Sequence, residues 1–318
     1  MTLQRYGMTV PLDGIPLADQ AEVARELAGL GYTDLWSSEA MGADAFTPLA
    51  VAATAEPTLR LGTAIVPAYT RGPACLAQSA ATLAATAPGR FVLGVGSSSQ
   101  LIVEGWNDKE FTEPYKRTRD VVRFLHKAFA GERVDEEFDT FRVSGFRLGV
   151  RMPEPPSIVV AALRSGMLKL AGRESDGAIV NWLSADDVRT VAPLVGEGKE
   201  VVARIFVMPT TDVDAARAVG RRMITAYLNV PVYAEFHRWL GREDDLAPMW
   251  KLWSDGDRKG ALDAVPDHLV DALILHGSPD ECREKVQAYV ENGITCPVLA
   301  MVPVGEDPRV TARSLAPR

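Results

Sequence analysis

The sequence predicts an α/β fold, a single (β/α)8 TIM barrel with insertions, on three observations. Short apolar runs of strand type alternate with segments of helical period almost from end to end, as parallel strands joined by crossover helices do. Eight such runs can be counted. The length of 318 residues suits a barrel of this kind, which routinely forms one domain. We therefore expect residues 1–318 to form one domain, with insertions over about 134–156 and 229–266.

The predicted strands are short, apolar and bounded by turn residues. They are Arg5–Val10, Asp34–Ser37, Arg60–Val66, Arg90–Gly94, Ile158–Ala161, Ala178–Asn181, Ala203–Met208 and Val298–Val302. Four of the helices between them have clear end signals. These are Leu17–Leu30 before Gly31, Pro73–Ala87 before Pro88-Gly89, Pro114–Ala130 before Gly131, and Pro279–Glu291, which follows the N-cap candidate Ser278.

Two stretches interrupt this rhythm. Val134–Pro156 has alternating aromatic residues and valines and predicts a hairpin before the fifth strand. Asn229–Pro266 is rich in tryptophan and charge and predicts extra helices between strands seven and eight. Because long insertions are usually functional or form interfaces, the second one is either a lid or substrate wall, or an oligomer contact.

Composition excludes several classes of protein. The net charge of −8 is spread along the chain and opposes nucleic-acid binding. The amino terminus, Met1–Leu12, lacks the pattern of a signal peptide, and no apolar run is long enough to span a bilayer, so we expect a cytoplasmic protein without a membrane partner. Three cysteines and four histidines lack paired or metal-ligand spacing, which predicts no disulfide and no metal. They are Cys75, Cys282, Cys296, His126, His237, His268 and His276, the last read as a hydrogen-bonded structural histidine.

In a barrel of this kind, binding and catalytic residues lie at the carboxyl ends of the strands. Strand two leads into Glu39, which could position a ring or relay a proton, or could be a solvated acid. Gly62 in strand three indicates either close approach of a ligand or an ordinary bend. Strand four ends in Gly96-Ser97-Ser98, whose small residues expose backbone N–H groups to a ring edge or a phosphate, or form a plain turn.

The following rim loop carries Glu104 and Trp106, and this tryptophan either stacks on a substrate or packs over the barrel edge. Strand five leads through Ala162-Leu163-Arg164-Ser165-Gly166-Met167 directly into a helix. Free N–H groups, the helix dipole and the adjacent arginine make this segment a good phosphate site. After strand six, Asn181 is expected to point toward the opening, Trp182 to be core or pocket wall, and Ser184 to cap the next helix.

Other chemistry has little support in the sequence. It contains no G-x-S-x-G elbow, no phosphate-binding P-loop and no H-E-x-x-H helix. A redox cofactor would explain this scarcity of nucleophiles and metal ligands, because it supplies the difficult chemistry and leaves the protein to position it.

Several segments, in this order and spacing, resemble the bacterial luciferase-like family. They are Gly31-Tyr32-Thr33-Asp34-Leu35-Trp36-Ser37-Ser38-Glu39, Leu61-Gly62-Thr63, Arg90-Phe91-Val92-Leu93-Gly94-Val95-Gly96, Ala171-Gly172-Arg173-Glu174-Ser175-Asp176-Gly177 and Gly277-Ser278-Pro279-Asp280-Glu281. The resemblance covers nearly the whole chain. It implies a (β/α)8 barrel that binds either FMN or the deazaflavin coenzyme F420.

Gly96–Trp106, with Ala162–Arg164 and Asn181–Leu183, resembles an actinobacterial subgroup of F420-dependent oxidoreductases, which favours F420 over FMN. The resemblance further implies a nonprolyl cis peptide at Ala64-Ile65, whose bulge backs the cofactor ring. It places Glu39 in contact with the ring, Gly96–Ser98 beside the ring or the tail of the cofactor, and Ala162–Met167 at the phosphate.

This chain departs from the sugar-phosphate dehydrogenases that the family contains. A histidine and a glutamate of those enzymes are replaced by Ala40 and Ser99, so sugar-phosphate oxidation by their mechanism is not expected. Glu39, Glu104 and Tyr69 are left as acid–base candidates, and Tyr69, Trp106, Asn181 and Trp182 as residues that could contact the substrate.

The expected function is hydride transfer between F420 and a small organic substrate. The alternatives are an FMN-dependent luciferase-like monooxygenase and a noncatalytic deazaflavin carrier or sensor. A homodimer is also expected from the resemblance.

Overall fold

The structure is a computed structural model that describes residues 5–303 and 305–317, and in these residues eight parallel strands close into a barrel. Around the ring the order is β1, β2, β3, β5, β8, β9, β10 and β12, and β12 pairs with β1. Their bounds are β1 Gly7–Thr9, β2 Asp34–Ser37, β3 Arg60–Thr63, β5 Phe91–Gly96, β8 Ser157–Ala161, β9 Gly177–Asn181, β10 Glu200–Met208 and β12 Cys296–Met301. The predicted TIM barrel is confirmed.

All eight predicted strands are present, with two differences in detail. The third strand is interrupted after Thr63 and resumes as β4, Val66–Pro67, which pairs with β5. A short strand that the sequence did not predict, β11 (Ile274–His276), pairs with the carboxyl end of β10 outside the closed ring.

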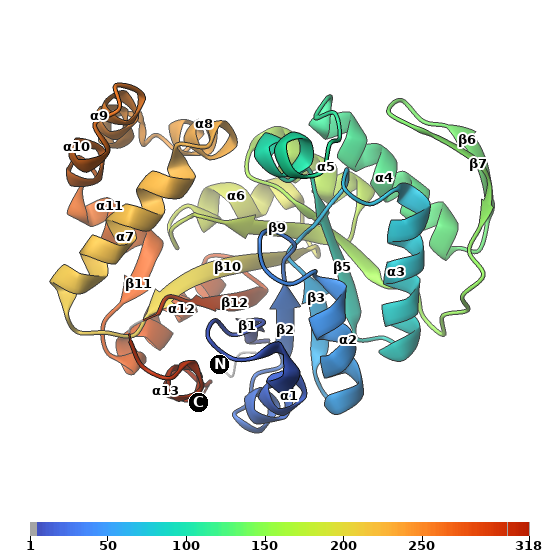
Figure 1. Ribbon diagram of the computed structural model, residues 1–318, viewed down its shortest axis with the longest axis horizontal. Helices are drawn as coiled ribbons and strands as arrows, with labels where there is room; N and C mark the ends of the chain where they lie inside the picture. The colour runs from blue at the N-terminus through green and yellow to red at the C-terminus, as the bar shows by residue number, and fades with distance from the viewer. Residues whose placement is uncertain (1–4, 304, 318) are drawn as a thin grey trace.

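Helices surround the strands (Figure 1). They are α1 Gln20–Gly29, α2 Phe46–Ala55, α3 Pro73–Thr86, α4 Pro114–Phe129, α5 Ser165–Glu174, α6 Val188–Val195, α7 Val213–Leu228, α11 Asp267–Leu273, α12 Pro279–Glu291 and α13 Pro308–Ser314, with a 3-10 turn η1 at Leu17–Asp19 and a π-helix η2 at Leu101–Trp106. The four helices with clear end signals lie where the sequence predicts them, the first being divided into η1 and α1.

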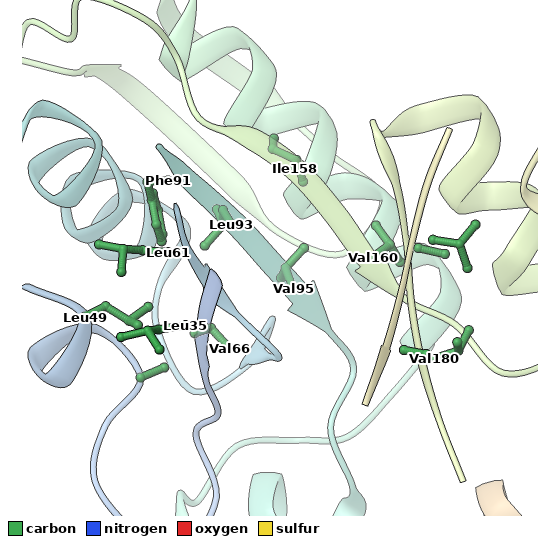
Figure 2. Packing of buried hydrophobic residues seen from close by; sticks show 14 of the residues in the cluster. Leu35, Leu49, Leu61, Val66, Phe91, Leu93, Val95, Ile158, Val160 and Val180 are labelled. Carbon is green, nitrogen blue, oxygen red and sulfur yellow. The ribbon is translucent and has the colours of Figure 1, made fainter. Parts of the chain in front are cut away.

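Each strand buries both of its faces. One face points to the surrounding helices and includes Leu61, Leu93 and Val160, which Figure 2 shows. The other points into the barrel, where seven side chains form a separate cluster: Trp36, Val92, Val159, Ile179, Val202, Cys296 and Val298. Burial on both faces explains why these strands read as continuous apolar runs in the sequence.

A tryptophan fills the middle of the barrel. A Cβ atom at Gly62 would lie 2.3 Å from the Trp36 ring, so this glycine makes room for the neighbouring strand's indole. Close approach of a ligand, one of the two interpretations offered for Gly62, is therefore wrong, because the space above it is occupied by protein.

The amino end of the barrel is closed by an ion cluster made of Arg5, Asp34, Arg60 and Glu200. The Arg60 guanidinium donates two hydrogen bonds of 2.6 Å to Glu200 and one of 3.3 Å to Asp34, which is fully buried. Since Arg60 lies on β3 and Glu200 on β10, the pair spans the inside of the barrel.

The two insertions have the predicted structure. Strands β6 (Arg133–Glu137) and β7 (Arg142–Arg147) form an antiparallel hairpin before β8. Helices α8 (Pro231–Trp239), α9 (Glu243–Ser254) and α10 (Arg258–Asp263) follow α7 and lie at the opposite side of the molecule from the hairpin (Figure 1). Among the described residues, no helix is both long enough and apolar enough to cross a membrane.

Candidate functional site

Toward the carboxyl end of the barrel, several inward-facing side chains are less completely buried than those in its middle. At the level of Trp36, Val159 and Val202 the inward-facing residues are fully buried. Two residues further along six of the strands, the inward-facing side chains keep part of their accessible surface, whereas Gly94 of β5 and Ala300 of β12 are buried. The six partly accessible residues are Thr9, Ser38, Ala64, Ala161, Asn181 and Arg204, which together define the carboxyl-end layer.

The third strand carries the predicted bulge. The peptide bond between Ala64 and Ile65 is cis and nonprolyl, as the resemblance implied. Its ends are held by backbone bonds, because Ala64 N–H donates to Ser37 O at 2.6 Å and Glu39 N–H donates to Ile65 O at 3.1 Å. The bulge therefore joins the ends of strands β2 and β3.

Gly96 lies next to this bulge, at the end of the neighbouring strand β5. A Cβ atom there would come within 2.6 Å of the Ala161 Cβ and 3.3 Å of Ile65 Cγ1. The three neighbouring strand ends thus pack closely at Ile65, Gly96 and Ala161, and a flat ring could lie against this wall.

Glu39 is engaged in an ion pair. Its carboxylate accepts a hydrogen bond of 2.9 Å from Arg71, and the backbone N–H of Ala45 lies 3.4 Å from the same oxygen. Both side chains of the pair are about four-fifths buried. The guanidinium of Arg71 also lies 5.0 Å from the centre of the Phe46 ring. Glu39 lies at the predicted strand end, and acid–base work would require it to leave this ion pair.

Glu104 lies on the π-helix η2 and is exposed. It accepts hydrogen bonds from Gln100 Nε2 at 2.6 Å and from the Phe111 N–H at 3.0 Å, and the Gln100 bond is the main reason that its pKa is lowered. Its contacts in the described part of the chain are with its own loop. Trp106, on the same π-helix, is 47% exposed, so both interpretations of it stay open.

Tyr69 follows β4 and is almost fully buried. Its hydroxyl donates to Thr112 O at 2.6 Å, and its ring packs against Phe111 and the Arg117 guanidinium. Burial raises the pKa of Tyr69 to about 12, so the phenol is protonated at neutral pH. The residue ties the two loops beyond strands three and four together.

The segment after β8 has the features of an anion site. Helix α5 begins at Ser165, and its N-cap residue, Arg164, makes no side-chain capping hydrogen bond, which leaves the first N–H groups available. The Arg164 side chain is half-exposed and lies 3.7 Å from Glu235 of α8. Ala162 and Leu163 lead into the turn, and Gly166 has open space around it.

Asn181, at the end of β9, belongs to the carboxyl-end layer, as predicted. Its Nδ2 lies 3.4 Å from the hydroxyl of Tyr233 on α8, a residue that sequence reasoning missed. The insertion that contains α8 therefore supplies part of the wall at this end of the barrel.

Trp182 is 1% exposed and packs between Phe206 and Tyr227, with ring centres 4.3 and 4.9 Å away. Of its two interpretations, core is the one that this burial favours.

The prediction that Ser184 caps the next helix is wrong. Helix α6 begins after Asp187, and Ser184 instead bonds the Asp187 carboxylate, which also accepts a hydrogen bond from Arg242.

Sequence reasoning also missed Arg204, whose side chain projects into the carboxyl-end layer from β10. Its Nε is buried without a hydrogen-bond partner. A signal was present, since Arg204 is the one charged residue within the otherwise apolar run Val201–Met208. A cation inside a strand that is buried on both faces is unusual and indicates a functional position.

Two other features lie apart from this end of the barrel. A hollow of about 680 Å³ is bounded by the end of α4 and residues 147–155, and no predicted site residue lines it. No group of three or more His, Cys, Asp or Glu side chains in residues 5–303 and 305–317 is arranged to hold a metal ion.

Comparisons with known proteins agree with this geometry. The family model described as luciferase-like monooxygenase matches residues 1–296. A protein of Mycobacterium tuberculosis named as a coenzyme F420-dependent oxidoreductase is 26% identical over 89% of this chain and 91% of its own. The 5,10-methylenetetrahydromethanopterin reductase of Methanolobus tindarius is 25% identical over 93% of both chains. The structure of the coenzyme F420 dependent tetrahydromethanopterin reductase from Methanopyrus kandleri superimposes with a TM-score of 0.78 at 21% identity, covering 98% of this chain and 97% of that one.

Proposed function

Since the chain belongs to the luciferase-like monooxygenase family, we propose that it is an oxidoreductase that transfers a hydride between coenzyme F420 and a small organic substrate. The observation that carries the choice of F420 is the similarity, over 89% of the chain, to a relative named as a coenzyme F420-dependent oxidoreductase. When bound, the deazaflavin supplies the hydride donor or acceptor, at C5 of its ring.

The residues at the carboxyl end of the barrel fit such a group. At the wall formed by Ile65, Gly96 and Ala161, the glycine adds no side chain and the alanine adds a single methyl group, so a flat ring could rest there beside the Ile65 side chain. The uncapped start of α5, with Arg164 beside it, suits a phosphate because backbone N–H groups and a cation both attract an anion. Ser97 and Ser98 follow Gly96, and their hydroxyls would be available to the ring or the tail of the cofactor.

The chain's own contribution is alignment. Hydride transfer requires the two carbons to be held near contact, and orientation of this kind supplies several kcal/mol of catalysis, about 7–11 in the best cases. The bulge at Ala64-Ile65 and the wall at Gly96 would fix the ring, while Asn181 and Tyr233 would face the substrate. Glu39 and Glu104 are the proposed acid–base residues, and Glu39 lies nearer the bulge through its bond to Ile65 O.

Titration of the purified protein with F420 and, separately, with FMN tests the cofactor assignment. We expect micromolar binding of F420, followed by its fluorescence, and weaker binding of FMN. Micromolar binding of FMN without binding of F420 would show a flavin monooxygenase instead. Binding of F420 without oxidation or reduction by any organic substrate would show a carrier or sensor.

The variant Arg164→Met tests the phosphate position. Loss of one charge-assisted hydrogen bond should weaken F420 binding about tenfold. Arg151→Met, which removes an exposed arginine away from the strand ends, is the matched control and should leave the affinity unchanged. Equal effects of the two variants would contradict the assignment of the α5 amino end to the phosphate.

A further inference from the structure

Arg204 projects into the barrel opening from the side opposite the bulge. It lies two residues beyond the inward-facing Val202 and is level with Asn181 on β9. Around the ring, β10 is four strands away from β3 in either direction. A molecule held between the Ala64-Ile65 bulge and Arg204 would therefore span the opening.

The guanidinium of Arg204 has no anionic partner in the described part of the chain. Its Nε is buried and unbonded, and burial lowers the pKa of the side chain. The contact it does make is with the Phe206 ring, whose centre lies 4.9 Å from Cζ. Arg60 and Arg242, which are also largely buried, both bond carboxylates.

An unpaired, desolvated cation costs free energy in the folded protein. Arg204 nevertheless keeps some accessible surface, so it faces the opening rather than the packed core. The unpaired guanidinium of Arg204 can be explained if a bound ligand supplies the negative charge that it lacks.

The neighbours of Arg204 indicate which anion this would be. Asn181 and Tyr233 are neutral hydrogen-bonding groups, and burial raises the pKa of Tyr233, which keeps the phenol protonated. Asp13, on the loop after β1, attracts the charge of Arg204 and so raises its pKa in part, but the two side chains do not form an ion pair. One cation, opposed in part by one carboxylate, matches a singly charged anion better than a phosphate dianion.

We propose that Arg204 binds a carboxylate group of the substrate, and that the protein acts on small organic acids. Asn181 and Tyr233 would bond the same end of the molecule. The role as a substrate anchor rests on the proposed function, whereas the anion site itself does not.

The probes are benzoate and benzamide, which have nearly the same shape and differ in charge. Titration calorimetry at neutral pH should show benzoate binding at least tenfold more tightly than benzamide to the wild-type protein. Arg204→Met should abolish this preference, and Arg204→Lys should retain part of it. Arg164→Met, at the other cation near the strand ends, should leave it intact. Equal binding of the two probes, or a preference that survives in Arg204→Met, would overturn the proposal, as would no binding of benzoate at millimolar concentration.

Thermal melting gives a readout that does not depend on a ligand. Because the charge is uncompensated, Arg204→Met should melt at the same temperature as the wild type or higher. An arginine that serves the fold would lower the melting temperature when removed, and that result would contradict a ligand-binding role.

F420 titration separates this inference from the proposed function. The affinity of Arg204→Met for F420 should equal that of the wild type, and a loss as large as that for benzoate would assign Arg204 to the cofactor and overturn the substrate assignment. If the wild-type protein binds benzoate through Arg204 but does not bind F420, the proposed function fails while the carboxylate site stands.

Discussion

Gly94 lies on β5 beside the interrupted third strand, where the carbonyl oxygen of Thr63 points at its Cα. A Cβ atom at this position would be 1.8 Å from that oxygen and 2.5 Å from Ile179 Cδ1. The Thr63 hydroxyl also bridges the two strands, accepting from Gly94 N–H and donating to Gly94 O, both at 2.8 Å. This glycine is therefore required by the approach of two backbones.

Gly94→Ala should destabilise the protein by about 2 kcal/mol or more, because the strands must separate to admit a methyl group. Urea unfolding followed by circular dichroism measures the loss. Gly29→Ala is the control, since Gly29 ends α1 and has no atom within 4 Å of a Cβ, so it should be neutral or slightly stabilising. Equal losses in both variants would contradict the role assigned to the Thr63 carbonyl.

At the residue scale, sequence reasoning predicted which residues lie at the strand ends but not the partners that they contact. The strand ends identified Glu39, Asn181 and the α5 amino end, because all carboxyl ends of a barrel face one opening. The Glu39–Arg71 pair and the isolation of Arg204 depend on which loops meet in space. Such contacts carry no local pattern in the sequence.

Among the helices and strands, α12 has the clearest capping signals in its sequence. Ser278 and Glu281 form a capping box, in which the serine hydroxyl accepts from the Glu281 N–H and the glutamate accepts from the Ser278 N–H. The predicted N-cap and both helix ends are confirmed. Hydrogen bonds between residues close in the sequence determine where α12 begins, so its start could be predicted from the sequence alone.

Ser278→Ala should cost about 1 kcal/mol of stability, because one N–H group at the start of α12 loses its acceptor. Ser254→Ala, at the end of α9, serves as the control and should change stability less. The comparison of their urea midpoints checks this, and an equal shift for both would show that the cap contributes little to the folded barrel.

Asp271 joins three elements: α11, on which it lies, α7 through Arg217, and β11 through His276 at 2.9 Å. His276 is buried and hydrogen-bonded, as the sequence predicts for a structural histidine. Hydrogen bonds from Arg217, and then from His276, lower the pKa of Asp271 to about 2. Its ionised form is therefore favoured in the folded state over the unfolded chain, where a carboxyl group titrates near pH ~4.

The stability that Asp271 contributes is present above pH ~4 and is lost as the pH falls toward about 2. The difference in urea midpoint between the wild type and Asp271→Asn should accordingly narrow as the pH is lowered from 6 to about 3. On an Arg217→Met background the same substitution should have little effect at any pH. A difference that does not change with pH would contradict this linkage. The carboxylate is one-third exposed, so the effect should be modest.

For the molecule as a whole, the barrel is closed at its amino end by Arg60. Arg60→Met would remove one of the two arginines that pair with the buried Asp34 and also the arginine that pairs with Glu200, and it should cost about 3–5 kcal/mol. Glu200→Gln keeps an acceptor of the same size and should cost less. Denaturant unfolding of the two variants measures this order, and the reverse order would show that Glu200, not Arg60, holds the closure.

The whole-molecule pattern was the easiest to predict. Eight strands buried on both faces give apolar runs that are separated by helix signals. Eight repeats of this strand–helix pattern favour a (β/α)8 barrel over other fold classes. β11 was missed because three residues are too few to show a period. The position of α8 against Asn181 could not be predicted, since it depends on packing between the insertion and α7.

The ion cluster at the amino end has a consequence for how this kind of chain can diversify. Closure of the barrel depends on residues such as Arg60 and Glu200, while contacts with ligands would fall to loops and to the helices after α7 at the far end. Mutations can accumulate in one set without disturbing the other. A laboratory search for new substrate preferences should therefore vary residues 98–113 and 229–266 and leave the base of the barrel untouched.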